Sequence, residues 1–276
     1  GLFSSIEGQE LLDELTRYRR DLHRIPELDD DLPRTIAYVR SVLSGLSCDV
    51  LEPCKGAVCA FFDLGRAETV AIRADMDALP IDEASGAAFS SEHPGRMHAC
   101  GHDGHMAMAL AAATWVDRVA RGADAVVRAG QLPRNVLFVF QPAEETTGGA
   151  KRVCESGVFE RYRVARIFGM HLWPDLPAGS LASRPGPLLA RSSETTITFH
   201  GVSSPFLLRF GHMTAGTVRN AVAGQARVEG SLRVFSDDMF ARAQDEVRAL
   251  AQTAADEEGC TFDLHFSEGY PPVVND

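Results

Sequence analysis

The feature that most constrains this chain is residues 98–105, which contain three histidines, one cysteine and one aspartate within eight positions. The segment stands directly before an uninterrupted apolar run, residues 106–116, that is typical of a helix. Thiolate, neutral imidazole and carboxylate are the side chains that bind zinc and similar metals, and a glycine between Cys100 and His102 lets both turn toward one point. The segment therefore predicts a metal site beside an apolar helix.

The spacing of these residues favours an open, catalytic metal centre. Structural zinc sites favour paired Cys-x-x-Cys units that close four ligands, and none of the six cysteines forms such a unit. Cys100 is the cysteine that sits among other ligand-type residues, whereas the other five are scattered and are expected to be reduced, mostly buried thiols. A structural site and a hydrogen-bonded cluster without metal are the alternatives.

Short β-rich runs alternate with helical patterns through the first part of the chain. Such alternation is typical of an α/β fold with a mostly parallel sheet. We predict helices over residues 11–22, 33–46, 104–119 and 149–156 and strands over residues 58–62, 70–73, 136–140 and 167–170.

Polar residues follow the last three of these strands at the point where each strand ends. Asp75 and Asp77 come after the first, Glu144 and Glu145 after the second, and His171 after the third. In open α/β sheets, the ligand crevice lies outside the carboxyl ends of the strands. We therefore expect these distant segments to converge on one site with the cysteine-containing loop.

A different pattern begins near residue 192 and predicts a second, α+β domain. Apolar and polar residues alternate in three segments, as in strands with one solvated face, and an amphipathic helix lies between the last two. The strands are predicted over residues 196–200, 228–234 and 262–266 and the helix over 237–258. A Pro-Gly-Pro cluster at 185–187 marks the boundary, which gives domains over residues 1–185 and 186–276.

Charge and hydropathy exclude several kinds of partner. The net charge of −11, without a basic run, argues against nucleic acid and anionic membranes. No stretch approaches the about 20 apolar residues of a transmembrane helix, and residues 1–9 lack the layout of a signal peptide. We expect a cytoplasmic protein that binds neither nucleic acid nor membrane.

Four motifs in this order resemble those of the M20 metallopeptidase superfamily, in particular its aminoacylase/hippurate hydrolase branch, which includes plant auxin-conjugate hydrolases. They are RADMDALP at 73–80, HACGHDGH at 98–105, QPAEE at 141–145 and GMHLWP at 169–174. The resemblance spans nearly the whole chain. It implies an α/β catalytic domain and a smaller α+β domain of ferredoxin-like type that serves as lid and dimerisation unit.

The resemblance also implies a role for each residue of the site. Cys100 would bridge two divalent metal ions, His102, Glu145 and His171 would be further ligands, and Glu144 would be the general base. Two metals about 3.5–4 Å apart can hold a hydroxide, polarise an amide carbonyl and stabilise the oxyanion. Mixed sulfur, nitrogen and oxygen ligands suit zinc or manganese, and they also admit cobalt or nickel.

Other residues are expected to support this site. We interpret Asp77 as an acceptor that orients a ligating histidine and give Asp103 a similar supporting position, with turn formation as the alternative for Asp77. Asn220 and Arg233 stand where family members hold the substrate's carboxylate, which a guanidinium can bind through two hydrogen bonds. The alternative for Arg233 is a surface residue on a strand edge. Histidines without an expected role are His23, His93, His200, His212 and His265.

The function predicted from these residues is hydrolysis of the amide bond in N-acyl or N-aroyl amino acids by a homodimer that pairs through its second domain. Alternatives within the superfamily are a dipeptidase, an aminobenzoyl-glutamate hydrolase and an N-acetyl-diaminopimelate hydrolase. In an alternative from another enzyme class, Cys100 is a nucleophile and His102 its base. A metal-binding or dimerisation module without catalysis is a third hypothesis.

The chain departs from the family pattern in two places. After residue 204, relatives continue with a longer, histidine-containing segment, and beyond residue 276 they return to the first domain with one more metal-ligating histidine. We expect this sequence to be part of a longer protein, with a truncated and inactive relative as the alternative.

Overall fold

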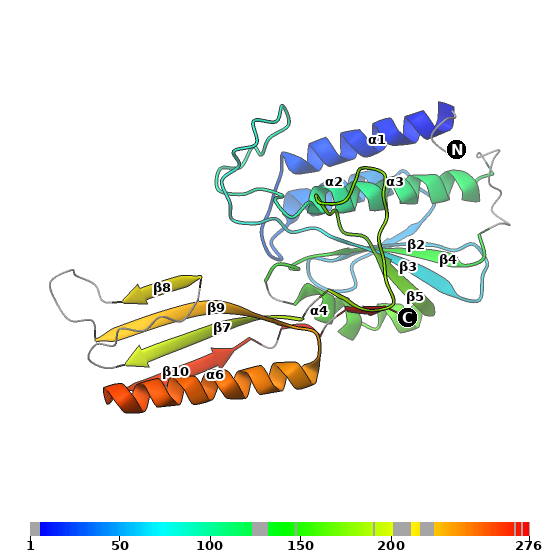
Figure 1. Cartoon of the computed structure of the whole chain (residues 1–276). Coiled ribbons are helices and arrows are strands. Elements are labelled where there is room, and N and C mark those ends of the chain that lie inside the picture. Colours follow the sequence, from blue (N-terminus) through cyan, green and yellow to red (C-terminus); the bar gives the residue numbers. More distant parts are fainter. Residues whose placement is uncertain are drawn as a thin grey trace. The chain divides into compact units, whose positions relative to one another are not determined.

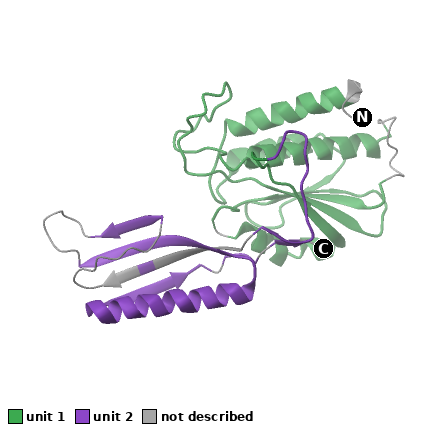
Figure 2. Cartoon of the chain, in the orientation of Figure 1, with its two compact units in different colours: residues 1–175 green, residues 176–276 purple. Residues whose placement is uncertain are grey.

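The computed structural model describes residues 6–122, 132–146, 148–189, 191–200, 211–215, 224–267, 269–271 and 273–275. The chain divides into two compact units, residues 1–175 and 176–276 (Figure 2). It passes from one to the other ahead of the Pro-Gly-Pro cluster at 185–187, where the sequence predicts the domain boundary.

The described part of the first unit contains a five-stranded sheet in the order β1-β2-β4-β3-β5. Three strands, β4 (Asn135–Gln141), β3 (Thr69–Asp75) and β5 (Val164–Gly169), run parallel to one another. On the other side of β4, β2 (Val58–Phe62) pairs antiparallel with β4, and β1 (Asp49–Leu51) pairs antiparallel with β2. This arrangement confirms the predicted α/β fold, in which the parallel strands form the part of the sheet that carries the polar strand ends.

Helices cover both faces of this sheet (Figure 1). One face packs against α1 (Ile6–His23), α2 (Pro33–Leu43) and α3 (His102–Ala120), and the other against α4 (Gly149–Glu155) and α5 (Val158–Arg161). None of the described helices combines the length and the apolar character needed to cross a lipid bilayer.

The central strand β4 shows how both cores form. Phe138 and Phe140 belong to the core beneath α1 and α3, whereas Leu137 and Val139 belong to the core beneath α4 and α5. Successive side chains of a strand point to opposite faces, so a strand covered on both sides is apolar at every position. All seven residues of β4 are buried accordingly.

The three parallel strands end at one edge of the sheet. Their register pairs Asp75 of β3 with Gln141 of β4 and Arg73 of β3 with Gly169 of β5. The segments that follow these strands therefore leave the sheet side by side, as the sequence predicts. The amino end of α3 lies at the same edge, where Gly101 adopts a φ of +87° just before the helix.

The described part of the second unit contains an antiparallel sheet in the order β10-β7-β9-β8, with the first and third strands in the centre, as in a ferredoxin-like βαββαβ unit. Its elements are β7 (Arg191–His200), β8 (His212–Ala215), β9 (Gln225–Val234), α6 (Asp237–Glu258) and β10 (Thr261–Phe266). A separate two-stranded ribbon pairs β6 (Gly186–Leu189) with β11 (Val273–Asn275).

The helix α6 has the bounds that the sequence predicts because both ends carry capping residues. The hydroxyl oxygen of Ser236 accepts a hydrogen bond from the Met239 N–H at 3.2 Å. Gly259 ends the helix with a φ of +64°, a conformation that glycine adopts without steric cost. Its buried residues are Phe240, Ala251, Ala254 and Ala255, and the sheet contributes buried Ile197, Val228 and Val234.

Candidate metal centre

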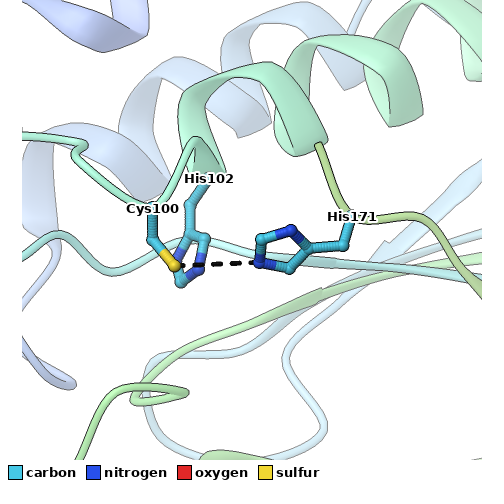
Figure 3. Close-up of side chains that lie close together, drawn as sticks. All are labelled: Cys100, His102 and His171. Carbon is cyan, nitrogen blue, oxygen red and sulfur yellow. Dashed lines mark hydrogen bonds between the residues drawn. The ribbon is translucent and has the colours of Figure 1, made fainter. Parts of the chain in front are cut away.

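Three ligand-type residues meet at the carboxyl edge of the first unit's sheet (Figure 3). The Sγ atom of Cys100 lies 3.7 Å from Nε2 of His171, and ligand atoms of Cys100, His102 and His171 all lie within 4.8 Å of one another. Cys100 comes from the turn before α3, His102 is the first residue of α3, and His171 follows β5. The fold thus brings together three residues that the sequence predicts to be metal ligands.

The two glutamates that follow β4 approach the same histidine. Nε2 of His102 lies 3.7 Å from Oε1 of Glu145 and 3.9 Å from Oε2 of Glu144. These three residues form a second group whose ligand atoms lie within 4.8 Å of one another. Nε2 of His102 therefore faces both glutamates, and the same ring belongs to the group with Cys100 and His171.

Hydrogen bonds fix which nitrogen of each histidine faces the centre. Nδ1 of His102 lies 2.7 Å from the main-chain carbonyl oxygen of Asp77, and Nδ1 of His171 lies 2.7 Å from that of Leu172. A carbonyl oxygen only accepts, so each Nδ1–H donates and each Nε2 is left for another partner. This is the arrangement that metal-ligating histidines require.

The buried atoms at this centre fit a cation. Nε2 of His102 and Oε1 of Glu145 are both buried, and neither has a hydrogen-bond partner in the described part of the chain. Buried polar atoms normally have a hydrogen-bond partner. Because these two atoms are both acceptors and face each other, a cation between them would satisfy both. Thiolate, imidazole and carboxylate together match the donors that zinc and manganese accept.

The pKa of His102 shows the same demand for positive charge. Burial lowers this pKa, but the interactions with Asp77 and Cys100 and the charge of Asp75 outweigh burial and raise it to about 11. The acidic groups around His102 therefore favour a positive charge at this position. Metal ligation needs neutral imidazole, so a bound cation would supply that charge in place of a proton on His102.

Asp77 holds the turn that carries the glutamates. Its carboxylate accepts hydrogen bonds from the N–H groups of Glu144, at 2.9 Å, and Glu145, at 3.0 Å. The preceding residue, Ala143, has a φ of +50°, and such a residue turns successive N–H groups toward one anion. The orientation of a histidine by Asp77 stays a prediction: its main-chain carbonyl oxygen lies 2.7 Å and its Oδ1 3.7 Å from Nδ1 of His102, and its carboxylate also positions the two glutamates.

Glu144 and Glu145 have different surroundings despite being neighbours. The Glu144 side chain is 41% exposed and that of Glu145 20% exposed. Burial raises the pKa of Glu144, and the negative charges of Asp75 and Glu145 raise it further. A raised pKa and an accessible carboxylate suit a group that accepts and releases a proton during a reaction.

Asp103 does not contact the predicted ligands by a described hydrogen bond. Its carboxylate lies 2.8 Å from Nδ1 of His23 and 3.4 Å from Nε of Arg19. His23, to which the sequence analysis gave no role, also lies 3.2 Å from Glu83 through its Nε2. These contacts join α1 to the first turn of α3, and so Asp103 supports the helix that begins with His102.

Asp75 and His105 form a buried pair beside the ligands, a pairing that the sequence does not predict. Oδ1 of Asp75 lies 2.6 Å from Nδ1 of His105, and its Oδ2 accepts from Nη1 of Arg73 at 2.6 Å. Burial by itself raises the pKa of Asp75, but the His105 hydrogen bond and the Arg73 charge hold it well below its ordinary value. The sequence does contain a signal that places His105 near the ligands. His102 and His105 are three residues apart, which puts both on one face of a helix.

The structure describes only one of the two predicted substrate-binding residues. Arg233 lies on β9 in the second unit, where it pairs in register with Ser192 and is exposed. Asn220 lies outside the described residues. A role for either residue in binding a carboxylate stays a prediction.

Comparison with known proteins gives consistent matches. Residues 71–276 match the model of Peptidase family M20/M25/M40. The chain is 33% identical over 299 residues to the N-acetyldiaminopimelate deacetylase of Exiguobacterium sibiricum, an alignment that covers 94% of this chain and 77% of that protein.

Solved structures show the same fold. The Bacillus subtilis YXEP protein, described as a dinuclear metal binding peptidase from the M20 family, superimposes with a TM-score of 0.77 at 32% identity, covering 97% of this chain and 77% of that one. A putative aminohydrolase from methicillin-resistant Staphylococcus aureus gives a TM-score of 0.80 at 27% identity, covering 97% of this chain and 79% of its own.

Proposed function

The chain belongs to peptidase family M20/M25/M40, and from this we propose that it is a metal-dependent hydrolase of N-acyl or N-aroyl amino acids, which releases a carboxylate and a free amino acid. The observation that carries the proposal is the position of His102. Its buried Nε2, which has no hydrogen-bond partner among the described residues, lies 3.7 Å from Glu145 and 3.9 Å from Glu144, and the same ring belongs to the group with Cys100 and His171.

Four residues are proposed to hold two divalent metal ions, and zinc and manganese are the first candidates for these ions. Cys100 would be shared between the ions, and His102, His171 and Glu145 would complete the ligands present in this chain. When bound, such a pair polarises an amide carbonyl and lowers the pKa of a water molecule. The support in the chain is that carbonyl oxygens engage Nδ1 of both histidines, which leaves Nε2 to face the centre, and that Oε1 of Glu145 is buried without a described partner.

Glu144 is proposed to move the proton. Its carboxylate would take a proton from the attacking water as the carbon–oxygen bond forms and deliver it to the amide nitrogen as the carbon–nitrogen bond breaks. The supporting observations are its raised pKa, its exposure and its fixed main chain. The hydrogen bond from Glu144 N–H to Asp77 holds the main chain of Glu144 while the charge of its side chain changes.

The proposed substrate class has independent support from a relative. N-Acetyldiaminopimelate, named in the deacetylase that is 33% identical to this chain, is itself an N-acyl amino acid. Its deacetylation is therefore the specific second candidate, ahead of the dipeptidase and aminobenzoyl-glutamate alternatives. We assign the substrate's carboxylate to Arg233, whose exposed guanidinium can form two hydrogen bonds with it. Homodimerisation through the second unit is part of the same proposal.

Alkylation of cysteines separates a metal-bridging Cys100 from a nucleophilic one. The chain should be treated with iodoacetamide with and without bound zinc, and each cysteine followed by peptide mass spectrometry. Zinc should protect Cys100, because coordination masks the thiolate, but it should leave the exposed Cys154 on α4 equally reactive in both forms. Equal alkylation of Cys100 in both forms would contradict coordination and favour the nucleophile.

A further inference from the structure

His171 lies in a segment that has little support of its own. Every residue from 170 to 176 is exposed, including Met170 at 48% and Trp173 at 52%. A metal ligand must nevertheless be held in a narrow range of positions. The contacts that fix this segment against the rest of the first unit therefore decide whether His171 can act as a ligand.

Leu172 makes the contacts that hold the segment. Its main-chain N–H donates to Nε2 of His105 at 2.9 Å, and the His105 and His171 rings stack edge to face with centroids 4.6 Å apart. Its side chain lies over two glycines: a Cβ atom at Gly104 would come 2.5 Å from Leu172 Cδ1, and one at Gly101 would come within 3.3 Å. The absence of side chains at both glycines makes room for Leu172.

The partners of His105 determine its tautomer. Nε2 accepts from an N–H group, so it carries no proton, and the proton lies on Nδ1, which donates to Asp75. Arg73 holds the second carboxylate oxygen of Asp75 and so fixes the acceptor. Both nitrogens of His105 are thereby used, although His105 lies within ligand distance of Asp75 and His102.

We propose that His105 is a positioning residue, which holds the Leu172 main chain through Nε2 and so places His171 at the metal centre, with Asp75 fixing the tautomer. This inference rests on the proposed function, since it takes His171 to be a metal ligand. If this inference holds, His105 is not itself a metal ligand. Residues of the RADMDALP and HACGHDGH motifs then also anchor the GMHLWP segment.

Two substitutions of His105 form a matched pair that tests this role. His105→Gln puts an amide oxygen near the position of Nε2, where it can accept from Leu172 N–H, whereas His105→Asn reaches only the position of Nδ1. Zinc binding to each metal-free variant should be measured by equilibrium dialysis beside His171→Ala. His105→Asn should weaken zinc binding about 10–100-fold, and His105→Gln should stay within a few-fold of the unsubstituted chain.

A double variant separates positioning from general damage. If His105 acts through His171, His105→Asn combined with His171→Ala should bind zinc no more weakly than His171→Ala alone. The proposal would be overturned if His105→Gln and His105→Asn weakened zinc binding equally. It would also be overturned if the double variant lost affinity by the product of the losses in His105→Asn and His171→Ala. Thermal unfolding of each variant shows whether lost binding reflects lost structure.

Nitrogen NMR of the metal-free, unsubstituted chain tests the tautomer without any variant. The inference requires a protonated Nδ1 and an unprotonated Nε2 on His105, with a scalar coupling between Nε2 and the Leu172 amide. A proton on Nε2 would overturn it, even in a chain that hydrolyses amides. Conversely, the expected tautomer in a chain that hydrolyses no amide would contradict only the proposed function.

Discussion

Two adjacent carboxylates, Glu144 and Glu145, are given different tasks by their surroundings, and substitution can separate them. Glu144→Gln removes the proton acceptor and should lower turnover about 10²–10⁴-fold while metal content stays unchanged. Glu145→Gln is the matched control, because it removes a proposed ligand and should lower metal content. Turnover and elemental analysis of both variants provide the test, and parallel loss of metal in Glu144→Gln would contradict its role as the base.

The raised pKa of Glu144 predicts the direction of a pH effect. A general base works only when it is ionised, so kcat/KM should fall as the pH drops through this pKa and should level off above it. A pH–rate profile with metal held saturating provides the measurement, and activity that rises toward acidic pH would be the opposite result.

The residues of the site differ in how far the sequence could reveal them. Cys100 and His102 stand in a ligand-rich motif before a predicted helix, His171 follows a predicted strand, and the fold brings the three together. The contact between His102 and Asp77 uses a main-chain carbonyl, which no side-chain pattern encodes. The partner of Asp103 is His23, 80 positions away on another helix, so only the packing of α1 against α3 reveals the pair.

At the level of elements, the turn between β4 and α4 depends on one glycine. A Cβ atom at Gly149 would overlap the carbonyl oxygen of Pro142, so alanine there must displace the backbone that leads to Glu144. We expect Gly149→Ala to lower the free energy of unfolding by about 3 kcal/mol, as in overpacked cores. Urea unfolding measures this change.

Gly45→Ala is the control for that substitution. A Cβ atom at Gly45 would meet only the carbonyl oxygen of Val42, at 3.6 Å, an ordinary contact distance. Its cost should stay within about 0.5 kcal/mol, as for most surface substitutions. Equal costs at the two glycines would mean that the close approach of Pro142 is relieved without strain.

Elements with strong patterns were predictable, and short or distant ones were not. The bounds of β2 and α6 agree with prediction because an apolar run and two caps define them. The three-residue strand β1 and the four-residue helix α5 are too short to show a period. The antiparallel direction of β2 was also hidden, since a strand buried on both faces has the same pattern in either direction.

For the whole molecule, the division into two units predicts where metal binding changes the dynamics. All four proposed ligands lie within residues 1–175. Zinc should therefore slow amide hydrogen exchange around residues 98–105, 143–146 and 170–173 and leave β9 and α6 unchanged. Exchange measured by mass spectrometry with and without zinc tests this, and protection confined to residues 176–276 would contradict the assignment of the ligands.

The central claim is that the full-length protein hydrolyses N-acyl amino acids only with its metals bound. The most direct measurement is the release of free amino acid from a panel of N-acyl amino acids, N-acetyldiaminopimelate included, by the full-length protein stripped of metal and then supplied with zinc or manganese. We predict that release is absent after stripping and returns on resupply. Release that persists in the stripped chain, or metal binding without any release, would contradict the account.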